Sequence, residues 1–208
     1  MMARIVQLQV GQMANFSYVV ADDKEKKAGV IDPSWDLEKI FNILQDNQWQ
    51  LEYIINTHTH FDHVLGNQIV ASKTGAKIIQ HKNSGQNIQI PVSHGDVIKI
   101  GNASLRVLYT PGHSMDSICL VLDNKSIFTG DTLFIGGCGR TDLPGGDPKE
   151  MYESLYTIII KLDDDLVVYP GHNYGSTVWS TIGNEKRNNF ALLAKTRRDF
   201  LYSMGSSI

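Results

Sequence analysis

The residues best suited to chemistry in this chain are His58–His63, which read HTHFDH and hold three imidazoles and one carboxylate. They directly follow the apolar run Leu51–Ile55, whose pattern predicts a short buried strand. Polar side chains crowded at the end of a buried strand cost free energy unless something compensates them. Imidazole nitrogen and carboxylate oxygen suit zinc, iron or manganese. The motif therefore predicts metal binding at the edge of a sheet.

The spacing within the motif predicts two ligand directions. His58 and His60 are two residues apart, so both can point to one side of an extended turn. Asp62 and His63 follow at the start of a predicted helix over residues 62–72 and can point elsewhere. Two directions favour two metal ions over one.

Three further predicted strands end in a possible ligand with a glycine beside it. These are residues 105–109 before His113, 126–129 before Asp131, and 166–169 before His172. Glycine allows a sharp turn and a close approach of the backbone to a crowded site. Five of the seven histidines lie either in the HTHFDH motif or after one of these further strands. The other two, His81 and His94, are predicted to be surface residues.

Strands interrupted by helices make up the rest of the pattern. Further strands are predicted over residues 5–10, 16–21, 28–31, 77–80, 96–100 and 118–122, and further helices over 36–46, 148–162 and 184–203. This order favours two sheets with helices on their outer faces, in a single domain spanning residues 1–208.

Composition excludes several classes of function. The net charge of −3 argues against a nucleic-acid partner, and no segment approaches the length of a membrane span. The longest basic run, Lys24–Lys27, is interpreted as a solvated turn between two strands. The N-terminus lacks a signal-peptide core, and Cys119 and Cys138 occur in contexts that do not suggest a disulfide. We therefore expect a cytoplasmic protein without a membrane partner.

The segments THTHFDH, TPGH, GDTLF and YPGH, in this order along nearly the whole chain, resemble the metallo-β-lactamase superfamily. The resemblance implies an α+β fold, an αββα sandwich of two mixed sheets packed face to face with helices outside. It also implies a dinuclear site at one edge. Carried over by position, site one holds His58, His60 and His113; site two holds Asp62, His63 and His172; Asp131 bridges both metals. Asp62 and Asp131 are then the catalytic carboxylates.

Two branches of the superfamily remain open. GDTLF followed by GCGR resembles glyoxalase II, which implies that Arg140 and Tyr174 contact glutathione. Arg140 could instead pair with Asp142, and Tyr174 could be a packing residue. GCGRTD, followed later by Tyr174 and residues 180–185, resembles persulfide dioxygenases more, and the aromatic-Glu-Gly segment of glyoxalase II is missing after Arg140. Ser114-Met115-Asp116 also departs from the usual Thr-Pro-Gly after PGH.

The favoured function is hydrolysis of a glutathione-type hydroxyacyl thioester by a hydroxide that two divalent metals share, zinc first, with iron or manganese as alternatives. The alternative is oxidation of glutathione persulfide at a single Fe(II) held by His58, His113 and Asp131. A structural or sensing metal site would close its coordination with four ligands and would not need seven. The expected partner is a small thiol-derived molecule, and the oligomeric state stays open, a homodimer included.

Overall fold

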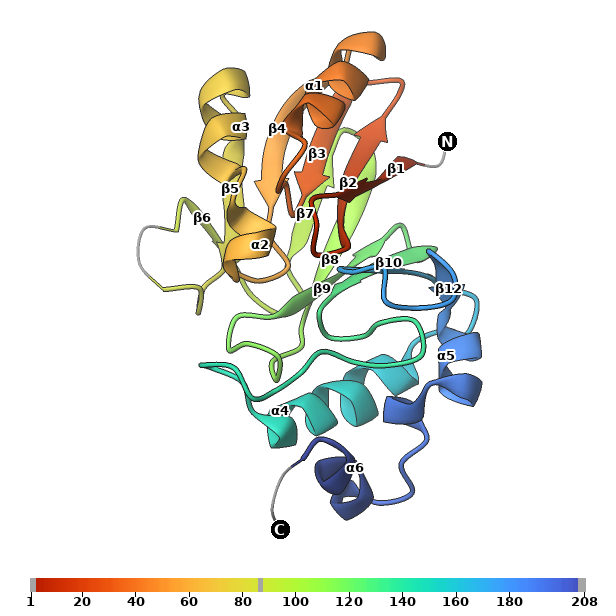
Figure 1. The fold of residues 1–208 in the computed structure, drawn as a ribbon. Helices are drawn as coiled ribbons and strands as arrows, with labels where there is room; N and C mark the ends of the chain where they lie inside the picture. Colours follow the sequence, from red (N-terminus) through yellow and green to blue (C-terminus); the bar gives the residue numbers. More distant parts are fainter. Residues whose placement is uncertain (1–2, 86–87, 206–208) are drawn as a thin grey trace.

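The computed structural model describes residues 3–85 and 88–205, which form two six-stranded sheets packed face to face (Figure 1). The first sheet has the order β1 (Arg4–Val10), β2 (Asn15–Asp22), β3 (Lys27–Ile31), β4 (Gln50–Ile55), β5 (Lys77–His81) and β6 (Ile90–Val92). The second has the order β12 (Ser180–Thr181), β11 (Val167–Pro170), β10 (Ser126–Gly130), β9 (Ile118–Leu122), β8 (Ala103–Tyr109) and β7 (Val97–Ile100). Both sheets mix parallel and antiparallel pairs, because β3 to β6 and β10–β11 pair in parallel.

Strand β2 shows why the sheets are covered on both faces. It is buried along its whole length. Successive side chains of a strand point to opposite faces. Phe16, Tyr18 and Val20 accordingly lie in the core between the two sheets, whereas Val19 and Ala21 lie in the core beneath the helices.

Helices cover the outer face of each sheet. Ile40 of α1 (Leu37–Asp46) and Val70 of α3 (Asn67–Thr74) pack on the first sheet. The second sheet is covered by α4 (Pro148–Glu153), the π-helical turn η1 (Ser154–Ile158), η2 (Ile159–Lys161), α5 (Ile182–Asn188), η3 (Phe190–Leu192) and α6 (Arg197–Ser203). The layers therefore run α, β, β, α, as predicted (Figure 1).

Some predicted elements are divided. Residues 62–72 do not form one helix. Instead α2 (Phe61–Val64) ends before Gly66, and α3 begins after it. Gly66 lies so close to the preceding loop that a Cβ atom would be 2.8 Å from the Pro33 carbonyl oxygen. Residues 184–203 contain three short helices, because Asn189 caps η3 and Thr196 caps α6.

The prediction that His81 lies at the surface is wrong. The His81 side chain is 2% exposed and stacks on the ring of Tyr109, with ring centroids 4.2 Å apart. Burial lowers its pKa. His94 is exposed, as predicted.

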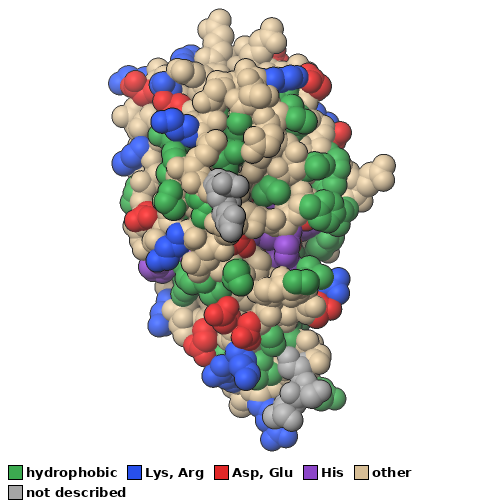
Figure 2. Space-filling view, turned by 90° about the vertical axis from the view of Figure 1, so that its left-hand side faces the viewer, with side chains coloured by type: hydrophobic (Ala, Val, Ile, Leu, Met, Phe, Trp, Pro, Cys, Tyr) green, Lys and Arg blue, Asp and Glu red, His purple; other side chains and the backbone are tan. Residues whose placement is uncertain are grey.

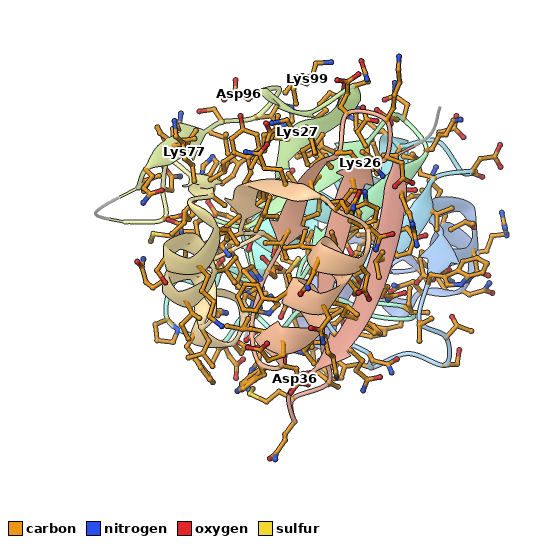
Figure 3. The ribbon with its side chains drawn as sticks, turned by 90° about the horizontal axis from the view of Figure 1, so that it is seen from above. Lys26, Lys27, Asp36, Lys77, Asp96 and Lys99 are labelled. Carbon is orange, nitrogen blue, oxygen red and sulfur yellow. The ribbon has the colours of Figure 1, made fainter. Side chains whose placement is uncertain are left out.

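The first three residues of the basic run lie exposed in the β2–β3 turn, and the last, Lys27, begins β3; Figure 3 labels Lys26 and Lys27 near the ends of these strands. Cys119 and Cys138 are both free thiols, as predicted. Within the described residues, no helix has the length and apolar character needed to cross a bilayer.

Candidate metal centre

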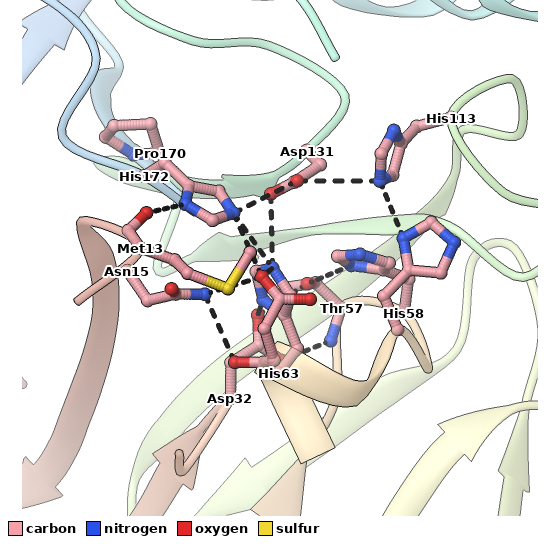
Figure 4. Close-up of polar contacts among 12 residues, drawn as sticks. Met13, Asn15, Asp32, Thr57, His58, His63, His113, Asp131, Pro170 and His172 are labelled. Carbon is pink, nitrogen blue, oxygen red and sulfur yellow. Dashed lines mark hydrogen bonds and ion pairs between the residues drawn. The ribbon is translucent and has the colours of Figure 1, made fainter. Parts of the chain in front are cut away.

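The structure brings all seven predicted ligand residues together at one edge of the sandwich (Figure 4). They follow the ends of β4, β8, β10 and β11, with α2 contributing two of them. Six are buried and His60 is half-buried. Their donor atoms form two groups, each within 4.8 Å: His58, His60 and His113, and Asp62, His63 and His172.

The distances within each group suit a metal ion. In the first group, His60 Nδ1 lies 2.9 Å from His113 Nε2. In the second, His63 Nε2 lies 3.2 Å from His172 Nε2, and Asp62 Oδ2 lies 3.5 and 3.4 Å from these two nitrogens. Tetrahedral zinc with bonds of ~2.1 Å places its ligand atoms about 3.4 Å apart. Both groups are able to hold a divalent cation.

Asp131 lies between the two groups. Its Oδ2 atom is 3.5 Å from His113 Nε2 and 3.3 Å from His172 Nε2, and its Oδ1 atom is 3.5 Å from His63 Nε2. Both Asp131 Oδ1 and His58 Nε2 are buried without a hydrogen-bond partner. Because a buried acceptor without a hydrogen-bond partner costs folding free energy, these two atoms indicate a site that binds a cation.

Hydrogen bonds to the outer ring nitrogens orient the histidines. His113 Nδ1 donates to the Arg140 carbonyl at 2.7 Å, and His172 Nδ1 donates to the Met13 carbonyl at 2.9 Å. A carbonyl only accepts, so each Nδ1 carries a proton and Nε2 is the nitrogen that faces the centre and would bind a metal.

Asp32 completes this arrangement and was not anticipated from the sequence. It accepts from His63 Nδ1 at 3.0 Å and from the Thr57 hydroxyl at 2.5 Å. Since the Thr57 hydroxyl hydrogen is used in that bond, its oxygen accepts from His58 Nδ1 at 3.2 Å. One buried carboxylate thus orients a histidine of each group. Its position directly after β3 repeats the strand-end pattern of the other ligands.

Glycines make room for the central carboxylate. A Cβ atom on Gly171 would lie 2.3 Å from Asp131 Oδ1. Gly130 has a φ of +48°, and a Cβ there would lie 2.5 Å from the Thr57 hydroxyl oxygen. Glycine is therefore required at both positions.

The pKa values of His58 and His60 in the first group and of His63 and His172 in the second are shifted in opposite directions. Burial holds the pKa of His58 well below its usual range and lowers that of His60. Burial also acts to lower the pKa of His63 and His172. Carboxylates outweigh it, so the pKa of His63 is raised and that of His172 reaches about 10.

These shifts predict unequal pH dependence of metal loading. The lowered pKa values of His58 and His60 favour their neutral, metal-binding forms, whereas His172 in the second group must release a proton before it can bind a metal. We expect occupancy of the second site to fall first as pH drops from 8 to 6, by about tenfold in affinity per pH unit for each proton displaced. Zinc calorimetry in buffers of different protonation enthalpy counts these protons. Equal proton release at both binding steps would contradict this assignment.

Asp116 explains the unusual residues after the PGH motif. Its buried carboxylate accepts from the Thr59 hydroxyl at 2.6 Å and from the Ser114 hydroxyl at 2.7 Å. Thr59 lies between two ligands of the first group, and Ser114 follows the third ligand, His113. Asp116 therefore ties together the two loops that carry the first group.

Replacing Asp116 with alanine should weaken metal binding at the first site by about tenfold or more, because groups that orient ligands carry effects of this size. Binding at the second site should change less. Competition with a chelator measures both affinities, and Asp46→Asn, at the exposed end of α1, is the control. Equal weakening at both sites would show a general loss of stability instead.

A cavity of about 720 Å³ opens onto these groups, and both predicted substrate residues line it. Tyr174 stacks on His172, with ring centroids 4.7 Å apart. Arg140 forms a two-pronged ion pair with Asp142, both exposed, and this pair lowers the pKa of Asp142 to about 2. Figure 2 shows histidine side chains at the surface bordered by hydrophobic ones.

Known proteins match this chain over most of its length. A hydroxyacylglutathione hydrolase from Polaromonas sp. is 41% identical over 77% of the chain, but the chain spans only 62% of that protein. The human mitochondrial persulfide dioxygenase ETHE1 is 32% identical over 92% of the chain and 76% of its own length. The crystal structure of ETHE1 from Myxococcus xanthus superposes with a TM-score of 0.92 at 32% identity, covering 99% of the chain and 90% of that protein.

The family model described as "Metallo-beta-lactamase superfamily" matches residues 10–89 and 83–172. These ranges contain all seven clustered ligand residues. Together with the four layers and the pair of histidine–carboxylate groups, the match shows that this chain belongs to the metallo-β-lactamase superfamily.

Proposed function

We propose that this protein is a metal-dependent hydrolase of the hydroxyacylglutathione hydrolase type, which cleaves a glutathione-type thioester at a two-metal site. One observation carries the proposal: the second group is complete, with Asp62, His63 and His172 within 3.2–3.5 Å of one another. Asp131 faces both groups, as a bridging ligand would. A structural site would need four ligands only.

The donor set fits two divalent cations, with zinc favoured and iron or manganese also suited. One cation would be held by His58, His60 and His113. The other would be held by Asp62, His63 and His172, and Asp131 would contribute to both sites. Bound there, the metals would supply Lewis acidity and lower the pKa of a shared water toward neutrality.

The remaining residues bind and orient the substrate. Arg140 can pair with a carboxylate through two parallel hydrogen bonds, and Tyr174 offers an aromatic face at the mouth of the cavity. The leaving thiolate has a conjugate acid with a pKa of about 8.5, so the reaction needs no strong general acid. This agrees with a cavity lined by metal ligands, apolar and aromatic side chains, Cys138 and Arg140, with no lysine among its lining residues.

A second candidate is a persulfide dioxygenase with a single iron. The persulfide dioxygenase relatives match the chain over a larger share of their length than the Polaromonas hydrolase does, which favours this candidate. His58, His113 and Asp131 would form the two-histidine, one-carboxylate face that suits Fe(II).

Metal analysis with two assays separates the candidates. Hydrolysis of S-lactoylglutathione by protein holding about two metals per chain supports the hydrolase. Oxygen consumption with glutathione persulfide, by protein holding one iron per chain and lacking thioester hydrolysis, would reject it.

A further inference from the structure

Arg140 is the one lysine or arginine among the described residues that line the metal cavity. Its backbone is fixed to the metal ligands. The Arg140 carbonyl accepts from His113 Nδ1 at 2.7 Å, and a Cβ on the preceding residue, Gly139, would lie 2.0 Å from the Asp131 carbonyl oxygen. The Arg140 side chain therefore extends from a backbone position that is fixed beside the metal centre.

This guanidinium already holds a carboxylate from its own loop. Arg140 Nε lies 2.6 Å from Asp142 Oδ1, and Nη2 lies 2.6 Å from Asp142 Oδ2. The two bonds occupy Nε and Nη2, which form one of the two edges through which a guanidinium can bind a carboxylate in bidentate fashion. Thr141, which lies between Arg140 and Asp142, is buried, so the backbone of both residues is held in place. Asp142 thus acts as a tethered competitor, and tethering makes even a weak contact effective.

The rest of the cavity wall offers little to a second anionic group. Apart from the metal ligands, Cys138 and Arg140, its lining residues are apolar or aromatic: Met13, Phe61, Phe134, Leu143, Pro144 and Tyr174. A carboxylate placed against these side chains would lose water without gaining a partner.

We propose that Asp142 is a specificity-determining residue that competes with a substrate carboxylate for Arg140. A carboxylate on the thiol half of the substrate then binds at this place more weakly than it would if Arg140 were unpaired. This inference rests on the proposed function only in placing a thiol-derived substrate in the metal cavity. Because exposed ion pairs are weak, the effect is a matter of about threefold to fivefold in affinity.

Binding of two thioethers that cannot be hydrolysed tests the proposal. S-methylglutathione carries carboxylates, whereas S-methyl-N-acetylcysteamine is neutral. With the metal-loaded full chain, Asp142→Asn should shift the ratio of the two dissociation constants toward S-methylglutathione by about threefold to fivefold. Adding Arg140→Gln to Asp142→Asn should reverse the shift. Glu150→Gln changes the net charge equally, but it lies exposed on α4 away from this cavity, and should leave the ratio unchanged.

An unchanged ratio in Asp142→Asn would overturn the proposal, as would an equal shift in Glu150→Gln, which would point to overall charge. Failure of every variant to bind S-methylglutathione at millimolar concentration would overturn it too. The readout needs no turnover. A protein that binds these thioethers as expected yet hydrolyses no thioester would refute the hydrolase and leave the role of Asp142 standing.

Discussion

Replacing Asp131 with asparagine should lower thioester hydrolysis by at least ~10³-fold, because metal-supplied stabilisation of a transition state amounts to several kcal/mol. Asp131 is the residue whose carboxylate contacts histidines of both groups. An amide keeps the shape but removes the charge, so neither cation would be held in its proper place. The same replacement should abolish the dioxygenase, whose single iron also needs this carboxylate. Steady-state rates and metal content measured on the same preparation check this expectation.

The replacement also changes the metal-free protein. Asp131 is buried beside His63 and His172, whose raised pKa values depend on the nearby carboxylates. Losing one partner of a buried charged group is destabilising, so thermal unfolding must be recorded alongside activity. Asp46→Asn, an exposed carboxylate at the end of α1, provides a matched control. If a folded Asp131→Asn protein kept activity within about tenfold of the parent, the assignment of this centre would be wrong.

The strand-end ligands could be anticipated because they obey a local rule. Each set of ligands comes just after an apolar run, and His113, Asp131 and His172 also have a glycine beside them; both signals are visible in the sequence. Gly171 shows the physical reason, since a Cβ there would collide with the Asp131 carboxylate. The two groups of three follow from the same rule once the sheets bring these edges together.

Features that depend on distant partners could not be anticipated in this way. His81 is buried because Tyr109 of another strand stacks on it, and nothing near His81 in the sequence indicates that partner. Asp32 obeys the strand-end rule but precedes Pro33, so it resembles an ordinary turn residue. Strands β6 and β12 have three and two residues, too few for an alternating pattern to be recognised.

Asp62→Ala should distinguish the two candidate reactions. Asp62 Oδ2 contacts His63 and His172 of the second group, and its ion pairs do not include His58, His60 or His113. Removing it should empty the second site while leaving the first intact. A two-metal hydrolase should then lose about 10²–10³-fold in rate, since the second cation no longer contributes. A mononuclear dioxygenase should stay within about tenfold, because its iron ligands are untouched.

Asn15→Ala provides the matched intermediate, because Asn15 Nδ2 donates to Asp62 Oδ2 at 2.9 Å and so orients the carboxylate without being a ligand candidate itself. In a two-metal hydrolase it should cost about tenfold in metal affinity at the second site. Rate and second-site occupancy should therefore fall together across the parent, Asn15→Ala and Asp62→Ala. A protein that hydrolyses thioesters at the parental rate with one metal per chain would show that the second cation is dispensable. The completeness of the second group would then no longer support a two-metal reaction.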